Sequence, residues 1–281
     1  MMRRIVIALL IAGAFSLAAH EGLHEQIAEV TRRLEREPGN AALFLRRGEL
    51  YRLHAQWSLA ARDYDRAATL DPKLAGVDLA RGLMLFDSGR TAAALVPLQR
   101  YVRTNGGDAH GHLALGRALA KAGRPSEAAA EFGVALDESA QNDPDVVLER
   151  VAALRAAGRP DEALQSLDAV LSRMGPVVTL QLAAIEIEVS AGRYDAALKR
   201  VDDAAAASPR KETWLERRGD ILMKADRVAE AHASYQAALD AVMTLPPDRR
   251  ATRAIADLER RLRCAVRPVI GHKSGTPYGG I

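Results

Sequence analysis

A short segment near the N-terminus, His20-Glu21-Gly22-Leu23-His24, contains the residue types that could bind a metal and carry out hydrolysis. On a helix, His20 and His24 lie one turn apart on one face, where both imidazoles can bind a zinc ion. Glu21 could then act as general base toward a zinc-bound water. The motif therefore suggests either a hydrolytic zinc site or a zinc or copper site without catalysis.

The segments around this motif argue against catalysis. An apolar run from Ile5 to Ala19 precedes it directly, so we expect the motif at the mature N-terminus, without a folded domain before it to wall a cleft. A catalytic zinc also needs a third protein ligand and an enclosed pocket. In the other interpretation, His20 to Glu25 is the polar start of a helix, with its glutamates near the positive end of the helix dipole. We favour this interpretation and expect no catalytic residue, cofactor or metal, with His20 and His24 as the candidates if a metal binds.

The N-terminal segment itself has the pattern of an export signal. Arg3 and Arg4 precede the apolar run, which is shorter than the roughly 20 residues of a membrane-spanning helix. The small residues Ser16, Ala18 and Ala19 lie where signal peptidase would cleave. We predict a cleaved signal peptide over residues 1–19 and a periplasmic or secreted protein. The alternative is an uncleaved segment that anchors the chain in the inner membrane.

Composition argues against a disulfide-stabilised protein and against a nucleic-acid-binding protein. Cys264 is the only cysteine, so no intramolecular disulfide can form. The formal net charge of +3 becomes +1 when Arg3 and Arg4 leave with residues 1–19. Nucleic-acid binding requires a pronounced basic face, so we expect no nucleic-acid partner. The sequence predicts no particular oligomeric state.

A pattern of two short amphipathic helices separated by a tight turn returns every 34 or 35 residues. Its copies, repeats 1 to 6, begin near Ala41, Ala75, Ala109, Pro144, Val178 and Glu212. The twentieth position is always alanine: Ala60, Ala94, Ala128, Ala163, Ala197 and Ala231. The eighth position is glycine in four repeats: Gly48, Gly82, Gly116 and Gly219. Small residues at both positions predict that the two helices approach closely, and this periodicity is typical of stacked helix pairs.

Two further positions complete the repeat. The fifteenth position is Gly89, Gly123, Gly158 or Gly192 in four repeats, which suits a left-handed cap at the end of the first helix. The twenty-fourth position is large: Tyr64, Leu98, Phe132, Leu167, Val201 and Tyr235. We expect these large residues to fill the gap between neighbouring repeats. At the seventh position, Arg47 is expected to form a surface ion pair with Asp63 on the paired helix.

On these residues the chain resembles the tetratricopeptide repeat family over about Ala41 to Met243. The resemblance implies an all-α fold: a right-handed α-solenoid of tandem helix-turn-helix units over residues 41–245, with a partial repeat over residues 20–40. It also implies a non-enzymatic scaffold, because in that family the first helix of each pair lines a concave groove that holds a peptide. The candidate groove residues are Leu45, Glu49, Arg52, Leu79, Leu83, Phe86, Leu113, Arg117, Lys121, Leu148, Arg155 and Leu182.

The candidate groove predicts the chemistry of its partner. Leucines with basic neighbours suit a protein or peptide that has hydrophobic anchors and some negative charge. Alternatively, the leucines pack against the preceding repeat. Family members that bind a C-terminal carboxylate use lysine and asparagine at the fifth and ninth positions, where repeat 1 has Leu45 and Glu49. We therefore expect a scaffold of the bacterial cell envelope that binds a protein or peptide in another way, and keep metal binding at His20 and His24, with or without hydrolysis, as the alternative.

The C-terminal segment is expected to close the array. After Leu245-Pro246-Pro247, one helix within residues 246–264 has an apolar stripe formed by Ala251, Ala254, Ile255, Leu258 and Leu262. An exposed end of stacked repeats needs a cap with a polar outer face. Its many arginines give an alternative, peripheral contact with an anionic membrane surface. Residues 265–281 are expected to be a disordered tail.

Overall fold

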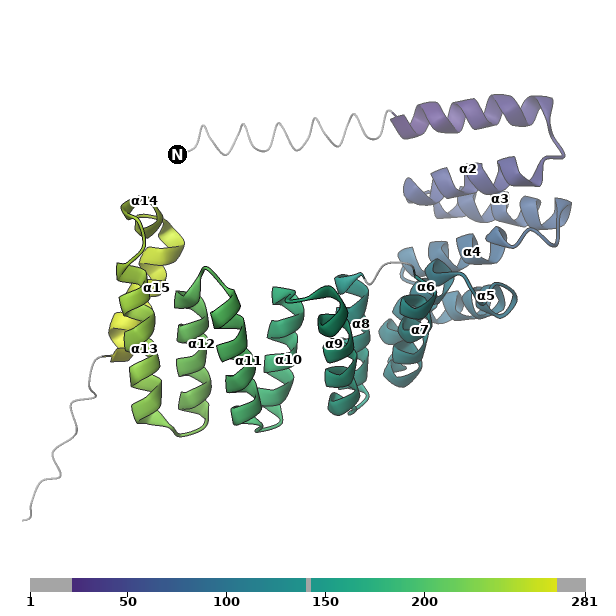
Figure 1. Ribbon diagram of the computed structural model, residues 1–281. Helices are drawn as coiled ribbons and strands as arrows, with labels where there is room; N and C mark the ends of the chain where they lie inside the picture. Colours follow the sequence, from purple (N-terminus) through teal and green to yellow (C-terminus); the bar gives the residue numbers. More distant parts are fainter. Residues whose placement is uncertain (1–21, 140–142, 267–281) are drawn as a thin grey trace, which may run out of the picture. The chain divides into compact units, whose positions relative to one another are not determined.

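The computed structural model of the chain describes residues 22–139 and 143–266 (Figure 1). The chain divides into two compact parts, an N-terminal part that ends at Ala163 and a C-terminal part that begins at Leu164. Every regular element in the described ranges is helical, which confirms the predicted all-α repeat class. The predicted signal peptide, His20 and Glu21 lie outside the described residues, as does the predicted tail beyond Val266.

The helices follow the periodicity of the sequence. The N-terminal part contains a helix over residues 22–36, then α2 (Ala41–Leu53), α3 (Trp57–Leu70), α4 (Gly76–Asp87), α5 (Thr91–Thr104), α6 (Ala109–Lys121), α7 (Pro125–Glu138) and α8 (Pro144–Ala156). The C-terminal part contains most of α9 (Pro160–Met174), then α10 (Val178–Ser190), α11 (Tyr194–Ala207), α12 (Lys211–Lys224), α13 (Val228–Met243), α14 (Pro247–Arg250) and α15 (Arg253–Val266). The first helix of each repeat begins within one residue of the start expected from the sequence.

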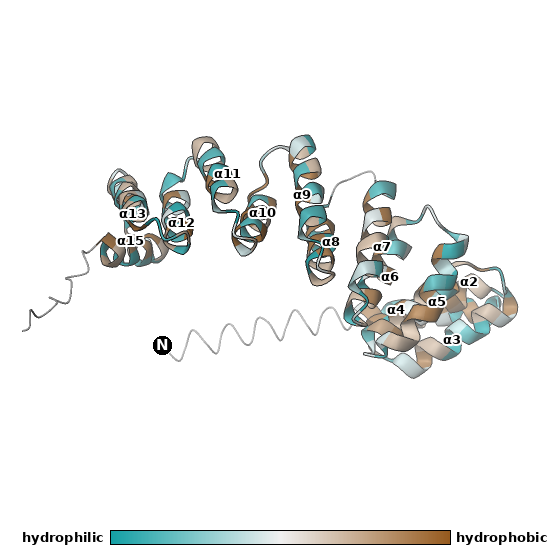
Figure 2. Cartoon of the chain, turned by 90° about the horizontal axis from the view of Figure 1, so that it is seen from below, coloured by the Kyte–Doolittle hydropathy of each residue, from teal (hydrophilic) through white to brown (hydrophobic). Residues whose placement is uncertain are grey.

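The helices pack as antiparallel pairs with the small residues inside. The six alanines at the twentieth position are all completely buried. Both helices of repeat 1 also contact the next pair, since α3 packs against α4 and α2 packs against α4. Figure 2 shows hydrophobic and hydrophilic residues on each of these helices, as expected when one face packs and the other meets solvent.

The glycines at the eighth position make room for the large residue at the twenty-fourth. A methyl group on Gly48 would lie 2.5 Å from Cε1 of Tyr64 in the same repeat. The same relationship holds in three further repeats: Gly82 with Leu98, Gly116 with Phe132 and Gly219 with Tyr235, at 2.5, 2.7 and 2.4 Å. These four large residues therefore lie against the glycine of their own pair, and Tyr64 also belongs to a buried cluster with Val77, Ala80 and Met84 of the next repeat.

The turn inside each repeat has one backbone conformation. Gly89, Gly123, Gly158 and Gly192 have positive φ angles between 71° and 81°. The next residue donates its amide N–H to the carbonyl five residues earlier, as Arg90 does to Leu85 over 2.8 Å. Repeats 1 and 6 form the same turn without glycine, through Ala55 at φ 54° and Asp226 at φ 58°.

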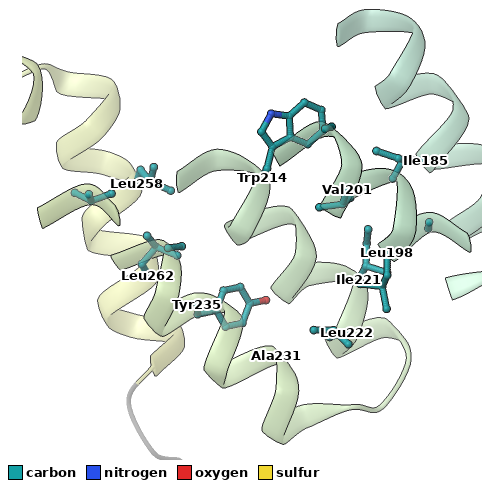
Figure 3. Close-up of a cluster of buried hydrophobic side chains, with 14 of the residues drawn as sticks. Ile185, Leu198, Val201, Trp214, Ile221, Leu222, Ala231, Tyr235, Leu258 and Leu262 are labelled. Atoms are coloured by element: carbon teal, nitrogen blue, oxygen red, sulfur yellow. The ribbon is translucent and has the colours of Figure 1, made fainter. Parts of the chain in front are cut away.

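The C-terminal segment differs from the single helix that was expected. It forms two helices, α14 and α15, because residues 247–250 contribute no buried side chain and do not share the apolar stripe. In α15, Ile255, Leu258 and Leu262 are buried in one cluster with Trp214, Tyr235 and Val242. Ala254 of α15 and Ala251, which precedes this helix, are exposed. Figure 3 shows Leu258 and Leu262 directed toward α12 and α13. The apolar face of α15 therefore packs on protein.

Among the described helices, none combines the length and the apolar character that a transmembrane span requires.

Candidate functional site

The candidate site in each part is the surface formed by the first helices of its own repeats: α2, α4, α6 and α8 in the N-terminal part, and, taken by itself, the surface of α10 and α12 in the C-terminal part. We call it the first-helix surface. None of the twelve residues expected to line a groove is buried. Arg117, Lys121 and Arg155 are exposed, and the other nine are half-buried. All but Leu182 belong to the N-terminal part. The twelve side chains predicted to line the groove are thus at least partly accessible to a partner.

The leucines at the fifth position pack against neighbouring helices and are also partly accessible to solvent. Leu45 packs against the cluster formed by α3 and α4, and its Cδ2 lies 3.0 Å from where a side chain on Gly76 would begin. Leu182 packs in the same way against the buried cluster of the C-terminal part. Both remain half-buried, so each supports its neighbouring helices and still presents part of its surface to solvent.

The basic groups of the candidate groove are largely neutralised by neighbouring carboxylates. Arg52 forms ion pairs with Glu49 over 3.0 Å and with Asp87 of α4. Arg117 donates three hydrogen bonds to Glu149 of α8, two from Nε and one from Nη2, and the shortest is 2.6 Å long. Because these pairs join first helices of successive repeats, they fix the spacing of the surface and leave less positive charge than the sequence suggested.

Two other polar side chains of this surface, Glu49 and Lys121, also have partners. Tyr64 donates its hydroxyl hydrogen to Oε1 of Glu49 over 2.7 Å. Burial and the adjacent carboxylate raise the pKa of Tyr64 above its ordinary value. Lys121 lies over the ring of Phe86 with its Nζ 5.0 Å from the ring centre, a cation–π contact between α6 and α4. The surface is therefore a preformed arrangement of apolar and paired polar side chains.

The C-terminal part has a pocket of about 340 Å³ on its first-helix surface. Val178 and Leu182 of α10 and Trp214 of α12 form its apolar lining. Arg210, Ser208, Thr213 and Arg217 complete the lining. Of these residues only Leu182 was predicted from the sequence. The others lie at the first, second, third and sixth positions of repeats 5 and 6 or in the preceding loop, and only their meeting in the fold makes them a pocket.

A larger cleft of about 670 Å³ lies in the N-terminal part, away from the predicted groove residues. The loop after α3, the start of α4 and the end of α5 line it. Two of its arginines already have carboxylate partners: Arg81 pairs with Asp65 over 2.7 Å and Arg100 with Asp78 over 2.6 Å. Its charges are therefore mostly used to hold α3, α4 and α5 together.

The early histidine motif is only partly described. His24 lies at the start of the described chain and is exposed, and its ring centre lies 4.5 Å from that of His54 at the end of α2. Sequence reasoning missed His54, because its proximity to His24 depends on the pairing of two helices. No group of three or more metal-ligating side chains occurs within the part of the chain that the structure describes.

Comparison with known proteins gives family and fold. A family model described as "Tetratricopeptide repeat" matches residues 6–175, and one described as "Tetratricopeptide repeat-like domain" matches residues 157–254. A search of curated proteins finds no match.

Similar solved structures share the fold at low sequence identity. A crystal structure of YrrB, titled "a TPR protein with an unusual peptide-binding site", has a TM-score of 0.54 and 20% identity over 67% of this chain and 97% of YrrB. PilF of Pseudomonas aeruginosa has a TM-score of 0.52 and 20% identity over 68% of this chain and 86% of PilF. A chain of the Naa15/Naa10 structure bound to HypK-THB has a TM-score of 0.52 and 15% identity over 88% of this chain and 39% of that chain.

Proposed function

The chain belongs to the tetratricopeptide repeat family, and from this premise we propose that it is a non-enzymatic scaffold of the bacterial cell envelope that holds a protein or peptide partner on its first-helix surface. Proteins of this family bind protein or peptide partners. The observation that carries the proposal is the accessibility of apolar side chains on this surface, among them Leu79, Leu83 and Phe86 of α4.

The geometry supports a hydrophobic contribution to binding. Side chains of this kind contribute about 25 cal/mol for each Å² of apolar surface that a partner buries. The paired arginines Arg52 and Arg117 hold successive first helices in place, so little ordering of the surface is needed on binding. The peptide-binding site named in the YrrB title supports a peptide as one class of partner.

The envelope location rests on the apolar segment that follows Arg3 and Arg4. Expression with and without residues 1–19, followed by cell fractionation, tests it. We expect the full chain outside the cytoplasm, cleaved after Ala19, and the truncated chain inside the cytoplasm. The same distribution for both chains would contradict the location.

Purification of the tagged chain from the envelope tests the binding surface. In a variant carrying Leu79→Arg and Leu83→Arg, we expect partner recovery to fall at least tenfold. Val96→Arg is the matched control, because Val96 is 59% exposed on the second helix α5. Thermal unfolding by circular dichroism checks that each variant remains folded. Equal recovery with the wild type and the double variant would contradict binding on this surface.

A second candidate function, metal binding near the N-terminus, is favoured by the proximity of His24 and His54. Neutral imidazoles are good ligands for zinc and copper. Titration calorimetry with Zn²⁺ and with Cu²⁺ tests it. Binding near one equivalent that is lost in both His24→Ala and His54→Ala, and kept in His110→Ala, would support this function; no binding, or binding unaffected by these substitutions, would exclude it.

A further inference from the structure

The pocket between α10 and α12 has the composition of an anchoring site for one particular kind of side chain. Val178, Leu182 and Trp214 form an apolar lining in a volume of about 340 Å³. This is enough space for one branched aliphatic side chain with part of its backbone. Val178 is 57% exposed and Trp214 only 7%, so the indole lies at the base of the pocket and the valine at its open side.

The charged residues of the pocket are of one sign. Arg210 and Arg217 line it, and no carboxylate does. Arg210 uses its Nε to donate to Glu212 over 3.1 Å, and its side chain stays 58% exposed. Arg217 is exposed and has no carboxylate partner among the described residues. Arg217 therefore differs from Arg52 and Arg117 in the N-terminal part, which pair with carboxylates of neighbouring helices.

We propose that this pocket binds a leucine-like side chain of a partner peptide whose flanking aspartate or glutamate residues pair with Arg210 and Arg217. The inference rests on the proposed scaffold function and names the class of partner that the C-terminal part selects. The hydrophobic side chain displaces water from the lining of Val178, Leu182 and Trp214. The flanking carboxylates accept hydrogen bonds from the guanidinium groups, whose planar N–H donors match a carboxylate in paired geometry.

The position of Trp214 provides a direct readout. The chain has two tryptophans, Trp57 in α3 and Trp214 in α12. In the full chain carrying Trp57→Phe, Trp214 is the only source of tryptophan emission. The probe is the blocked peptide acetyl-Gly-Asp-Leu-Asp-Gly-amide, which has no free terminal carboxylate. We expect a saturable change in emission, weakened by added salt because the charged pairs are exposed.

Two control peptides separate the apolar and the charged contributions. In one, serine replaces the leucine; in the other, asparagine replaces both aspartates. We expect each to bind at least tenfold more weakly than the probe. Equal affinity for all three peptides, or no saturable change with the probe, would overturn the inference.

Variants of the pocket complete the test. Arg217→Gln should weaken the probe about fivefold, the value for one exposed ion pair. Val178→Asp should weaken it at least tenfold, because the new carboxylate occupies the arginines; Val178 is exposed enough for the fold to tolerate the change. Arg103→Gln, which removes an exposed arginine of α5 in the N-terminal part, should leave affinity unchanged. An equal loss in Arg103→Gln and Arg217→Gln would show general charge attraction and overturn the inference.

Failure of this inference is distinguishable from failure of the scaffold function. If the peptides do not bind but the envelope partner is still lost in the Leu79→Arg, Leu83→Arg variant, only the assignment of the C-terminal pocket is wrong.

Discussion

Arg47 and Asp63 are joined by two parallel hydrogen bonds between α2 and α3, where Asp63 is 5% exposed. Arg47 donates from Nε to Oδ2 over 2.7 Å and from Nη2 to Oδ1 over 2.8 Å. Its Nη1 also donates to Oγ1 of Thr31 over 3.3 Å, which ties repeat 1 to the preceding helix. The hydrogen bond to Asp63 raises the pKa of Arg47. The pair was expected on the surface, and its burial makes it a structural element of the first repeat.

Replacing Asp63 with asparagine should destabilise the protein by about 3 kcal/mol, because the guanidinium then keeps its partly buried position without a counter-charge. Urea unfolding measures the loss. Asp65→Asn is the matched control, since Asp65 is 72% exposed where it pairs with Arg81. That change should cost less than about 1 kcal/mol. Similar losses in both variants would contradict the distinct role of the buried pair.

Alanine at two helical glycines should have opposite effects. Gly116→Ala places a methyl group 2.7 Å from Cε1 of Phe132 and should destabilise by about 1–3 kcal/mol through overpacking. At Gly133 of α7 the nearest atom, Cζ of Arg150, lies at 3.4 Å, an ordinary contact. Gly133→Ala should stabilise by about 0.5–1 kcal/mol because alanine favours the helix. Thermal unfolding compares the two; stabilisation by Gly116→Ala would refute the packing argument.

Glycine at the two strained turns should increase stability. Ala55 and Asp226 adopt left-handed backbone conformations that cost a non-glycine residue about 1 kcal/mol. Ala55→Gly and Asp226→Gly should each raise the free energy of unfolding by somewhat less than that amount, because glycine also gains freedom in the unfolded chain. Gly158→Ala, with φ at 73° in the equivalent turn, should lower it. Chemical denaturation measures the change in unfolding free energy for each variant. Destabilisation by Ala55→Gly would contradict the conclusion that the backbone at Ala55 is strained.

The hydrogen bond between Tyr101 and Asp108 should make stability depend on alkaline pH. Tyr101 donates to Oδ2 of Asp108 over 2.6 Å, and burial together with this carboxylate raises the pKa of Tyr101 from 10.0 to about 12. Burial raises the pKa of Asp108, but hydrogen bonds from Tyr101, His110 and Gly111 outweigh it and the net direction is downward.

The sign follows from proton binding. Between pH 10 and about 12, the tyrosine of the unfolded chain loses its proton before that of the folded chain, so stability falls as pH rises. The difference in unfolding free energy between wild type and Tyr101→Phe should be constant from neutral pH up to pH 10 and shrink above it. Measured denaturation curves at several pH values test this, and a difference that stays constant to pH 12 would contradict it.

The repeat boundaries and the small buried residues could be predicted because they recur at fixed intervals. The invariant alanine at the twentieth position indicates that the paired helices approach closely. The glycine at the fifteenth position indicates a left-handed turn between them. Ala55 shows the limit of that reasoning, since the same turn forms there without glycine. The split between α14 and α15 could not be predicted from the pattern of apolar residues, which continued through Ala251.

The charge of the candidate surface was harder to predict. Arg52 pairs with Asp87 of the next repeat, and Arg117 with Glu149, 32 residues away. Such pairs depend on how successive first helices align, which the sequence of one repeat does not contain. For the same reason the pocket at Trp214 was missed: Val178, Arg210 and Arg217 come from two helices and a loop that meet only in the fold.

Cross-linking in the intact envelope tests the central claim most directly. A photoreactive amino acid is placed at Leu83 of α4, on the first-helix surface, or at Val96 of α5, which is exposed on the second helix of the same repeat. Irradiation followed by mass spectrometry should yield one abundant cross-linked partner from the Leu83 position and little or none from Val96. Equal yields from both positions, or a partner captured only from Val96, would contradict a scaffold that binds through its first helices.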